Sequence, residues 1–197
     1  PDKVETRLGT LEFFDGFPTE DTTRKCFDNL DFLRGVEAFL NGCPGASMVA
    51  LRQGLRDIGA VDGTIFITET LMNARSLFLT PNTESIYTGT WLDLRAEPIV
   101  VESPPNVLGI VNDFWFRYVG DLGNAGPDRG QGGKFLFVGP GYEGEIPEGY
   151  FVFRSPTHGN ALIMRGFLVD GVPQPAVQSL KKHARVSPLS LAGSAPE

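Results

Sequence analysis

Several side chains that could bind a small ligand lie in one stretch of the sequence, residues 112–134. This stretch reads NDFWFRYVGDLGNAGPDRGQGGK. Strand alternation over residues 107–119 places Asp113, Trp115 and Arg117 on the face opposite the core. A tryptophan between two charged residues suits a sugar ring or another planar ligand. It equally suits an interface between domains, where Trp and Arg are enriched, or an exposed ion-pair network. Binding of a small ligand and packing on a partner are therefore both open for this strand.

The strand leads into a glycine-rich loop that carries Asp121, Asn124 and Asp128. Their oxygen atoms could bind calcium, but an EF-hand loop places ligands at every second residue and ends in Glu, and this spacing differs. Asp and Asn also cap turns, while glycine supplies positive φ. If the loop does bind a ligand, its glycines let the backbone approach while Asp121 and Asn124 supply hydrogen bonds. The sequence predicts no metal site and keeps these two residues as candidates.

A second polar segment, TPNTES at residues 80–85, holds Asn82 and Glu84. Both side chains could face a pocket. An Asx-type turn between two strands is the favoured interpretation, because Asn side chains commonly hydrogen-bond to the backbone two residues on. Asn82 and Glu84 are kept as candidates for ligand binding.

The chain has no motif that assigns a catalytic residue or a cofactor. GPGYEG at residues 139–144 matches GxGxxG, but Pro147 and Gly149 exclude the helix that a dinucleotide site needs, so we expect a hairpin connection there. The GQGGK segment lacks the first Gly and the Ser/Thr of a Walker A loop. HExxH, CxxC and GxSxG are absent from the sequence. We therefore predict no cofactor and leave the catalytic residues unassigned.

The elements that position these residues change in type near residue 62. Apolar residues at helical spacing predict helices over residues 20–41 and 47–59, and Gly42 and Pro44 between them predict a helical hairpin. Eight short β-type runs follow, punctuated by Gly, Pro, Asn and Asp: TIFIT, SLFLT (residues 76–80), SIYTGTWLDL, PIVVES, VLGIVNDFWFRYV, KFLFV, YFVFRS and ALIMRGFLVDG. This pattern predicts a mainly β chain, with an antiparallel sandwich over residues 64–169.

Three segments follow from these elements. Residues 1–62 form an N-terminal arm and a helical hairpin lobe. Residues 63–190 form the β-sandwich, which ends in a short helix over 174–185. Residues 191–197 have no partner element and are predicted to be a linker to a second domain.

Composition excludes some classes of partner. The net charge is -7, and no cluster of five or more basic residues occurs, so nucleic acid is not an expected partner. No apolar run reaches the ~18 residues that a membrane span requires. If residues 20–41 form one helix, Cys26 and Cys43 lie roughly 25 Å apart by helical rise, which excludes a disulfide between them. Both are expected to be buried thiols.

Several separated motifs, in order, resemble the bacterial domain-of-unknown-function family 1254. They are FLTPNTESIYTGTWLDL, EPIVVESPPNVLGIVNDFWFRYVGDLGNAGPD, GKFLFVGPGYEGEIPEGYFVFRSPTHG, RGFLVDG and the closing SPL. The resemblance implies an immunoglobulin-like sandwich with a helical lobe, followed in such proteins by a jelly-roll domain of unknown-function family 1214. It also implies a periplasmic or secreted location, with a cytoplasmic one left open. It carries no catalytic residue set that could be transferred to this chain.

Two hypotheses from different classes follow. In the first, the chain is a structural and interaction module that packs on a jelly-roll domain or another subunit, including a second copy of itself. In the second, it is part of a hydrolase or lyase that acts on carbohydrate or another small ligand in a cleft between domains. Convergence of Asp113, Trp115, Arg117, Asp121 and Asn124 on a concave pocket would favour the enzyme, and a flat apolar surface ringed by them would favour the interface.

Overall fold

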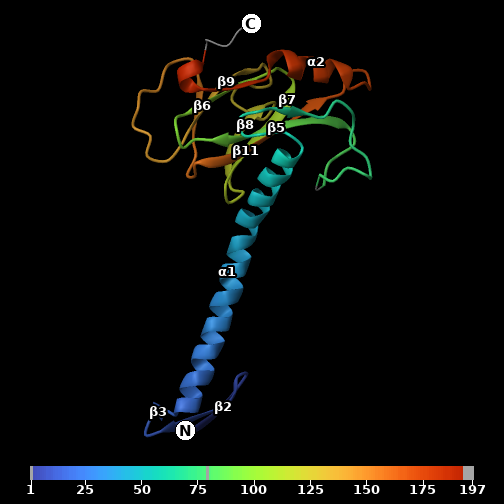
Figure 1. Cartoon of the computed structure of the whole chain (residues 1–197). Coiled ribbons are helices and arrows are strands. Elements are labelled where there is room, and N and C mark those ends of the chain that lie inside the picture. The colour runs from blue at the N-terminus through green and yellow to red at the C-terminus, as the bar shows by residue number, and fades with distance from the viewer. Residues whose placement is uncertain (1, 79, 193–197) are drawn as a thin grey trace. The chain divides into compact units, whose positions relative to one another are not determined.

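The computed structural model describes residues 2–78 and 80–192, and the chain divides into two compact units, Pro1–Ala46 and Ser47–Glu197. The predicted mainly β fold is confirmed: three sheets are accompanied by one long helix and one short one (Figure 1). In chain order the elements are β1 (Lys3–Thr6), β2 (Gly9–Phe14), β3 (Phe17–Pro18), α1 (Glu20–Asp57), β4 (Phe66–Ile67), β5 (Ser85–Asp93), β6 (Ile99–Ser103), β7 (Val107–Asp113), β8 (Tyr118–Gly123), β9 (Gly133–Val138), β10 (Phe151–Arg154), β11 (Gly159–Phe167), α2 (Gln174–His183), β12 (Arg185–Pro188) and the 3₁₀ helix η1 (Leu189–Leu191).

In the first unit, β1, β2 and β3 form a small antiparallel sheet that is hydrogen-bonded to the start of α1. The Thr19 hydroxyl accepts the backbone N–H of Thr22 at 3.3 Å, and Glu20 and Asp21 occupy the first turn, where acids favour a helix start. The buried Thr22 hydroxyl accepts the N–H of Glu12 at 2.7 Å and donates to its carbonyl at 3.0 Å. These bonds join the sheet to the helix.

The predicted helical hairpin is wrong, because α1 continues through Pro44 without a turn. A proline removes one backbone N–H and kinks a helix, but packing beyond it can offset that cost. Met48, one turn after Pro44, is 1% exposed and packs on Trp91 and Ala161. Gly42, the other predicted stop signal, does not take the left-handed conformation of a helix C-terminus.

The expectation of buried thiols is also wrong. Cys26 and Cys43 both lie in α1, and both are exposed.

In the part of the chain that the structure describes, no helix is long and apolar enough to cross a membrane.

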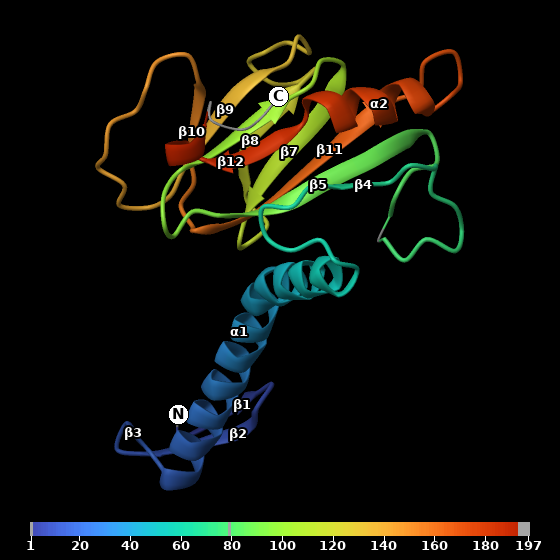
Figure 2. The ribbon, with the colours of Figure 1, turned by 45° about the horizontal axis from the view of Figure 1, so that its top comes forward.

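In the second unit, two sheets share one hydrophobic core. The first sheet has the order β4-β5-β11-β7-β8 and the second the order β10-β9-β6-β12. The helix α2 packs against β11, β4 and β5 and adds Val177 and Leu180 to the core (Figure 2). The central buried residues are Ile86, Leu92, Leu94, Val101, Val107, Val111, Leu122, Phe135, Phe137, Leu162, Met164, Val177 and Leu180.

Two details of the sheets differ from the expectation. The strands β9 and β10 pair in parallel, so the segment between them is not a hairpin connection. A parallel pair needs a connection of about a dozen residues, and residues 139–150 supply it. The run at residues 76–80 was expected to be a strand, but no strand includes its described residues.

The predicted linker, residues 191–197, begins at the last residue of η1, and 193–197 lie outside the described residues.

Candidate functional site

The strand predicted over residues 107–119 is in fact a tight hairpin. The strand β7 ends at Asp113 and β8 begins at Tyr118. The Asp113 N–H donates to the Arg117 carbonyl at 2.8 Å, and the Phe116 N–H donates to the Asp113 carbonyl at 2.9 Å. Phe116 takes a φ of 62°, which closes the turn. The alternation assumed from the sequence therefore stops at Asp113, and we call residues 113–118 the aromatic tip.

The Asp113 side chain holds the aromatic tip together. It is fully buried, and its carboxylate accepts the backbone N–H groups of Trp115 and Arg117, both at 2.9 Å. It also accepts Nε of Arg117 at 2.8 Å and pairs with Nη2 at 2.6 Å. The Arg117 side chain is 59% exposed. Since Asp113 faces the turn backbone and Arg117, its role in the structure is to fix the turn.

The aromatic tip presents large apolar side chains to solvent. Trp115 is 44% exposed, Phe116 61% and Tyr118 62%. Phe114 points the other way and packs against the buried cluster around Trp91. Its ring meets that of Trp115 edge-on, with 5.5 Å between the centroids. The tip is thus an anchored turn with an aromatic outer surface, and a contiguous apolar surface on a rigid support is typical of an interaction site.

Asp121 lies beside this surface in β8. Its carboxylate accepts the Tyr118 hydroxyl at 3.0 Å. Desolvation and this hydrogen bond raise the pKa of Tyr118 above its ordinary value. The structure therefore brings four of the residues singled out from the sequence to one hairpin: Asp113, Trp115, Arg117 and Asp121.

Asn124 lies at the opposite end of β8, roughly 20 Å from the aromatic tip by strand rise. The glycine-rich loop that follows is ordered by Asp128, which is buried and accepts the N–H groups of Gly123 at 2.8 Å and Gly132 at 3.1 Å. Both glycines have positive φ, of 76° and 79°. Asp128 therefore caps a turn, which is the alternative to calcium binding that the sequence left open.

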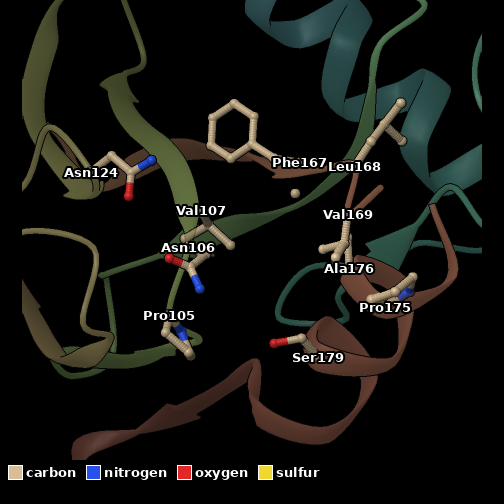
Figure 3. Close-up of a pocket in the computed structure, with 11 residues that line it drawn as sticks. Pro105, Asn106, Val107, Asn124, Phe167, Leu168, Val169, Pro175, Ala176 and Ser179 are labelled. Carbon is tan, nitrogen blue, oxygen red and sulfur yellow. The ribbon is translucent and has the colours of Figure 1, made fainter. Parts of the chain in front are cut away.

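Asn124 borders a cavity of about 460 Å³ between the ends of β7, β8 and β11 and the helix α2. Figure 3 shows the Asn106 and Asn124 amides, the Ser179 hydroxyl and the Phe167 ring around it. None of the lining residues carries an ionisable side chain. The cavity therefore offers hydrogen bonds and an aromatic face, but no group of its own for acid–base catalysis. Its walls are formed by Pro105, Asn106, Val107, Asn124, Gly166, Phe167, Leu168, Val169, Pro175, Ala176 and Ser179.

Asn82 and Glu84 lie in the turn before β5. The Asn82 side-chain oxygen accepts the Glu84 N–H at 3.0 Å and the Ser85 hydroxyl at 2.7 Å. The Asn82 N–H donates to the hydroxyl of Tyr87 at 2.9 Å. These are the bonds of the Asx-type turn that the sequence favoured, and neither Asn82 nor Glu84 is among the residues that line the cavity.

An ion-pair network at the end of α1 was not predicted from the sequence. Asp62 accepts Nε of Arg52 at 3.2 Å and Nη2 of Arg56 at 2.7 Å. The Arg52 guanidinium also lies 5.0 Å from the centroid of the Trp91 ring and 3.7 Å from Asp93. Arg52 and Arg56 occupy adjacent turns of the helix, and only the tertiary fold brings Trp91 and Asp93 to them. No motif spacing along the chain links these residues.

This network predicts a loss of stability in acid. The hydrogen bond from Arg52 chiefly lowers the pKa of Asp62, and Arg56 lowers it further. The stabilisation is complete above the unfolded-state pKa of about 4 and is lost as the pH falls through the lower folded-state pKa. Below about pH 4, urea unfolding should show a steeper loss of stability for the wild type than for Asp62→Asn or Arg52→Ala. Equal slopes for all three proteins would contradict this prediction.

Among residues 2–78 and 80–192, no group of three or more His, Cys, Asp and Glu side chains is placed to hold a metal ion. The aromatic tip and the cavity are two surfaces of the second unit with a chemistry suited to binding.

Comparison with solved structures gives a protein of similar fold from Vibrio parahaemolyticus and a weaker match from Burkholderia cenocepacia. The VPA0106 protein from Vibrio parahaemolyticus is similar over 81% of this chain, with a TM-score of 0.60 and 19% sequence identity. An uncharacterised protein from Burkholderia cenocepacia is similar over 82%, with a TM-score of 0.40 and 12% identity. This chain spans 39% of the first protein and 44% of the second. No curated protein matches the chain.

The comparison with protein-family models assigns the second unit. The model described as "Protein of unknown function (DUF1254)" matches residues 63–188, which include every strand of the two sheets, the aromatic tip, the cavity walls and α2. The chain therefore belongs to the DUF1254 family of proteins of unknown function.

Proposed function

We propose that this domain is an interaction module, which packs through its aromatic tip on a second, jelly-roll domain or on another subunit. The observation that carries the proposal is the exposure of Trp115, Phe116 and Tyr118 on a turn that the buried Asp113 holds rigid. A preorganised turn loses little conformational entropy on binding, so more of the apolar burial contributes to affinity. Aromatic residues are also the side chains most enriched at interface hot spots.

The surface around the aromatic tip supports the same role. On the outer face of the five-stranded sheet, Ile110 of β7 is 37% exposed and pairs with Ile163 of β11. Ile110 also pairs with Asp121 of β8. An apolar centre with Arg117 and Asp121 at its edge has the composition of a protein interface, with a hydrophobic core and a polar rim.

The length of the VPA0106 protein supports a second domain as the partner. This chain spans well under half of the VPA0106 protein, so the relative contains further chain against which the equivalent surface could pack. An immunoglobulin-like arrangement of the two sheets and a periplasmic or secreted location belong to the same proposal. Both rest on the likeness to two-domain proteins of family 1254 with a family 1214 jelly roll.

A second candidate function is favoured by the cavity beside Asn124. Two amides, a hydroxyl and an aromatic ring suit a neutral ligand that bears hydroxyl groups, such as a carbohydrate. This is the chemistry of the alternative in which the domain contributes to a hydrolase or lyase. The absence of an ionisable group among the lining residues means that the catalytic groups would have to come from another part of the protein.

The test is calorimetric titration of this chain with a separately expressed jelly-roll domain from a two-domain protein. The double variant Trp115→Gln/Phe116→Asn removes the aromatic surface, and Asn tolerates the positive φ at position 116. We expect it to weaken binding by at least about 100-fold, the size of a hot-spot loss. The control Phe14→Gln changes a side chain that is 77% exposed in the first unit and should bind like the wild type.

Equal affinity of the wild type and the double variant, with unchanged circular dichroism, would disprove the role of the aromatic tip. A separate NMR titration of the wild type and the double variant with neutral mono- and disaccharides tests the second candidate. Chemical-shift changes confined to Asn106, Asn124 and Phe167, in the wild type and the double variant alike, would favour the cavity as the site.

A further inference from the structure

The helix α1 carries an apolar face in the first unit that its own sheet leaves open. Positions on one side of a helix recur at alternating spacings of three and four residues, and such a line runs through Thr22, Lys25 and Asn29 to Phe32, Val36 and Phe39. The apolar residues Leu33 and Leu40 flank the line. We call Phe32, Leu33, Val36, Phe39 and Leu40 the helix face.

The small sheet of the first unit covers the beginning of this line. Thr22 is buried by hydrogen bonds to Glu12, Lys25 donates to the Thr10 carbonyl at 3.3 Å, and Asn29 accepts Nη2 of Arg7 at 2.8 Å. Each of these three helix positions is polar and has a partner in the sheet or in its connecting turn. The apolar residues begin at the next position, Phe32, where these contacts end.

The helix face itself is exposed. Phe32 is 68% exposed, Leu33 50%, Val36 41%, Phe39 71% and Leu40 61%. A helix that is apolar on one side is stabilised mainly by covering that side. Single exposed apolar residues are common, but five on adjacent turns form a patch of the kind that marks an association site.

We propose that the helix face pairs with the same face of a second copy of this chain, so that α1 forms a short two-helix coiled coil between copies. The 4–3 spacing of Phe32, Val36 and Phe39 is the repeat that lets two helices interlock along a seam. A seam of this kind is self-complementary and closes as a symmetric dimer. This surface lies in a different unit from the aromatic tip, so the inference stands apart from the proposed function.

The residues beside the seam are compatible with two identical helices. In a heptad whose core positions are Phe32, Val36 and Phe39, the flanking positions are Leu33 and Leu40 on one side and Gly35 and Gly42 on the other. In a parallel pair each leucine would face a glycine of the other helix, and in an antiparallel pair leucine would face leucine and glycine would face glycine. No like charges face each other, and the glycines let the helices approach closely.

Charge argues against a membrane surface as the occupant. Between Glu20 and Cys43 the helix carries five acidic residues and three basic ones, and the whole chain has a net charge of -7. Helices that lie on membranes are rich in Lys and Arg on the polar face, because bilayers are anionic. An acidic helix of this kind is repelled by such a surface, whereas a second protein helix imposes no such penalty.

The area available is sufficient for a modest dimer. With roughly 150–200 Å² for each large side chain, the exposed fractions of the helix face correspond to on the order of 500 Å² per copy. The total for two copies is then close to the about 1,000 Å² that a specific interface needs. We expect a dissociation constant on the order of 10 μM rather than a permanent dimer.

The test is sedimentation equilibrium of the full chain from about 1 to 200 μM, a range that brackets the expected dissociation constant. Phe39→Glu places a charge in the seam and should weaken dimerisation by at least about 100-fold. Asn41→Glu introduces the same residue two positions along the helix, on the side away from the seam, and should leave dimerisation unchanged. Both positions are exposed, so circular dichroism should show the wild-type helix content for both variants.

A wild-type chain that stays monomeric over the whole range would overturn the inference. So would a dimer that Phe39→Glu and Asn41→Glu affect equally. The aromatic-tip variant Trp115→Gln/Phe116→Asn separates the two interfaces. Loss of the dimer in that variant, with Phe39→Glu still dimeric, would assign self-association to the aromatic tip and remove the coiled coil. If the aromatic-tip variant loses binding to the jelly-roll domain but still dimerises, the result concerns the proposed function and leaves the coiled coil supported.

Discussion

Replacing Asp113 by alanine is expected to lower the free energy of unfolding by about 2–4 kcal/mol, because it leaves the N–H groups of Trp115 and Arg117 without their acceptor inside the turn. For a domain of this size that corresponds to a fall in melting temperature of roughly 5–15 °C. Asp113 is fully buried, so water cannot replace the carboxylate without opening the hairpin. Urea unfolding followed by tryptophan fluorescence measures the change.

Two variants on the same hairpin sharpen this prediction. Asp113→Asn keeps an oxygen that can accept both backbone bonds and loses only the pairing with Arg117, so its loss should be intermediate. Asp121→Ala removes a carboxylate that accepts one bond from the exposed Tyr118, and it should cost less than about 1 kcal/mol. Equal losses for Asp113→Ala and Asp121→Ala would show that the aromatic tip does not depend on the buried carboxylate.

Gly123→Ala is expected to destabilise the protein by at least about 4 kcal/mol or to prevent folding, because two separate constraints act at this position. A Cβ there would lie 2.0 Å from the Val107 carbonyl oxygen and 2.6 Å from its carbon, so the backbone of β7 would have to move. The φ of 76° is also one that alanine adopts only with strain. The soluble yield and the midpoint of urea unfolding measure the effect.

Gly141→Ala is the matched control for that substitution. Gly141 has a similar φ of 72°, but no atom lies within 4 Å of the position that its Cβ would take. It should therefore show the conformational cost alone, about 1–2 kcal/mol. If the two variants were equally stable, the close approach of the glycine-rich loop to β7 would play no part in holding the loop.

Sequence periodicity was a good guide wherever an element is specified by its own residues. The two-residue period predicted the positions of β5, β6, β9 and β11, whose side chains alternate between a shared core and the opposite face. The helix predicted over residues 174–185 is α2, which ends two residues earlier. The Asx-type turn at Asn82 follows from a side chain that bonds to its near neighbours.

Elements that depend on distant contacts were not predictable in the same way. Gly42 and Pro44 are strong local stop signals, yet α1 continues past them. Met48, one helical turn after Pro44, is buried against Trp91, which lies 43 positions further along the chain. The turn at residues 113–117 contains no glycine or proline, and its signal is the burial of Asp113, which no local pattern shows. The parallel pairing of β9 and β10 depends on the path of the connection between them, and the glycines of that connection fit a hairpin equally well.

The same division holds for the candidate site. The amino-acid sequence by itself determined the chemistry that is available: an aromatic and charged segment at residues 113–118, amides and glycines after it, and no catalytic motif. Only the tertiary structure decided that the buried Asp113 supports the turn while Trp115 and Phe116 face solvent, and that Asn124 lies with Asn106 and Ser179 at a cavity. The physical reason is that residue type and spacing act over a few positions. Burial, by contrast, and with it the role of a carboxylate or an amide, is set by strands and helices that pack from distant parts of the chain.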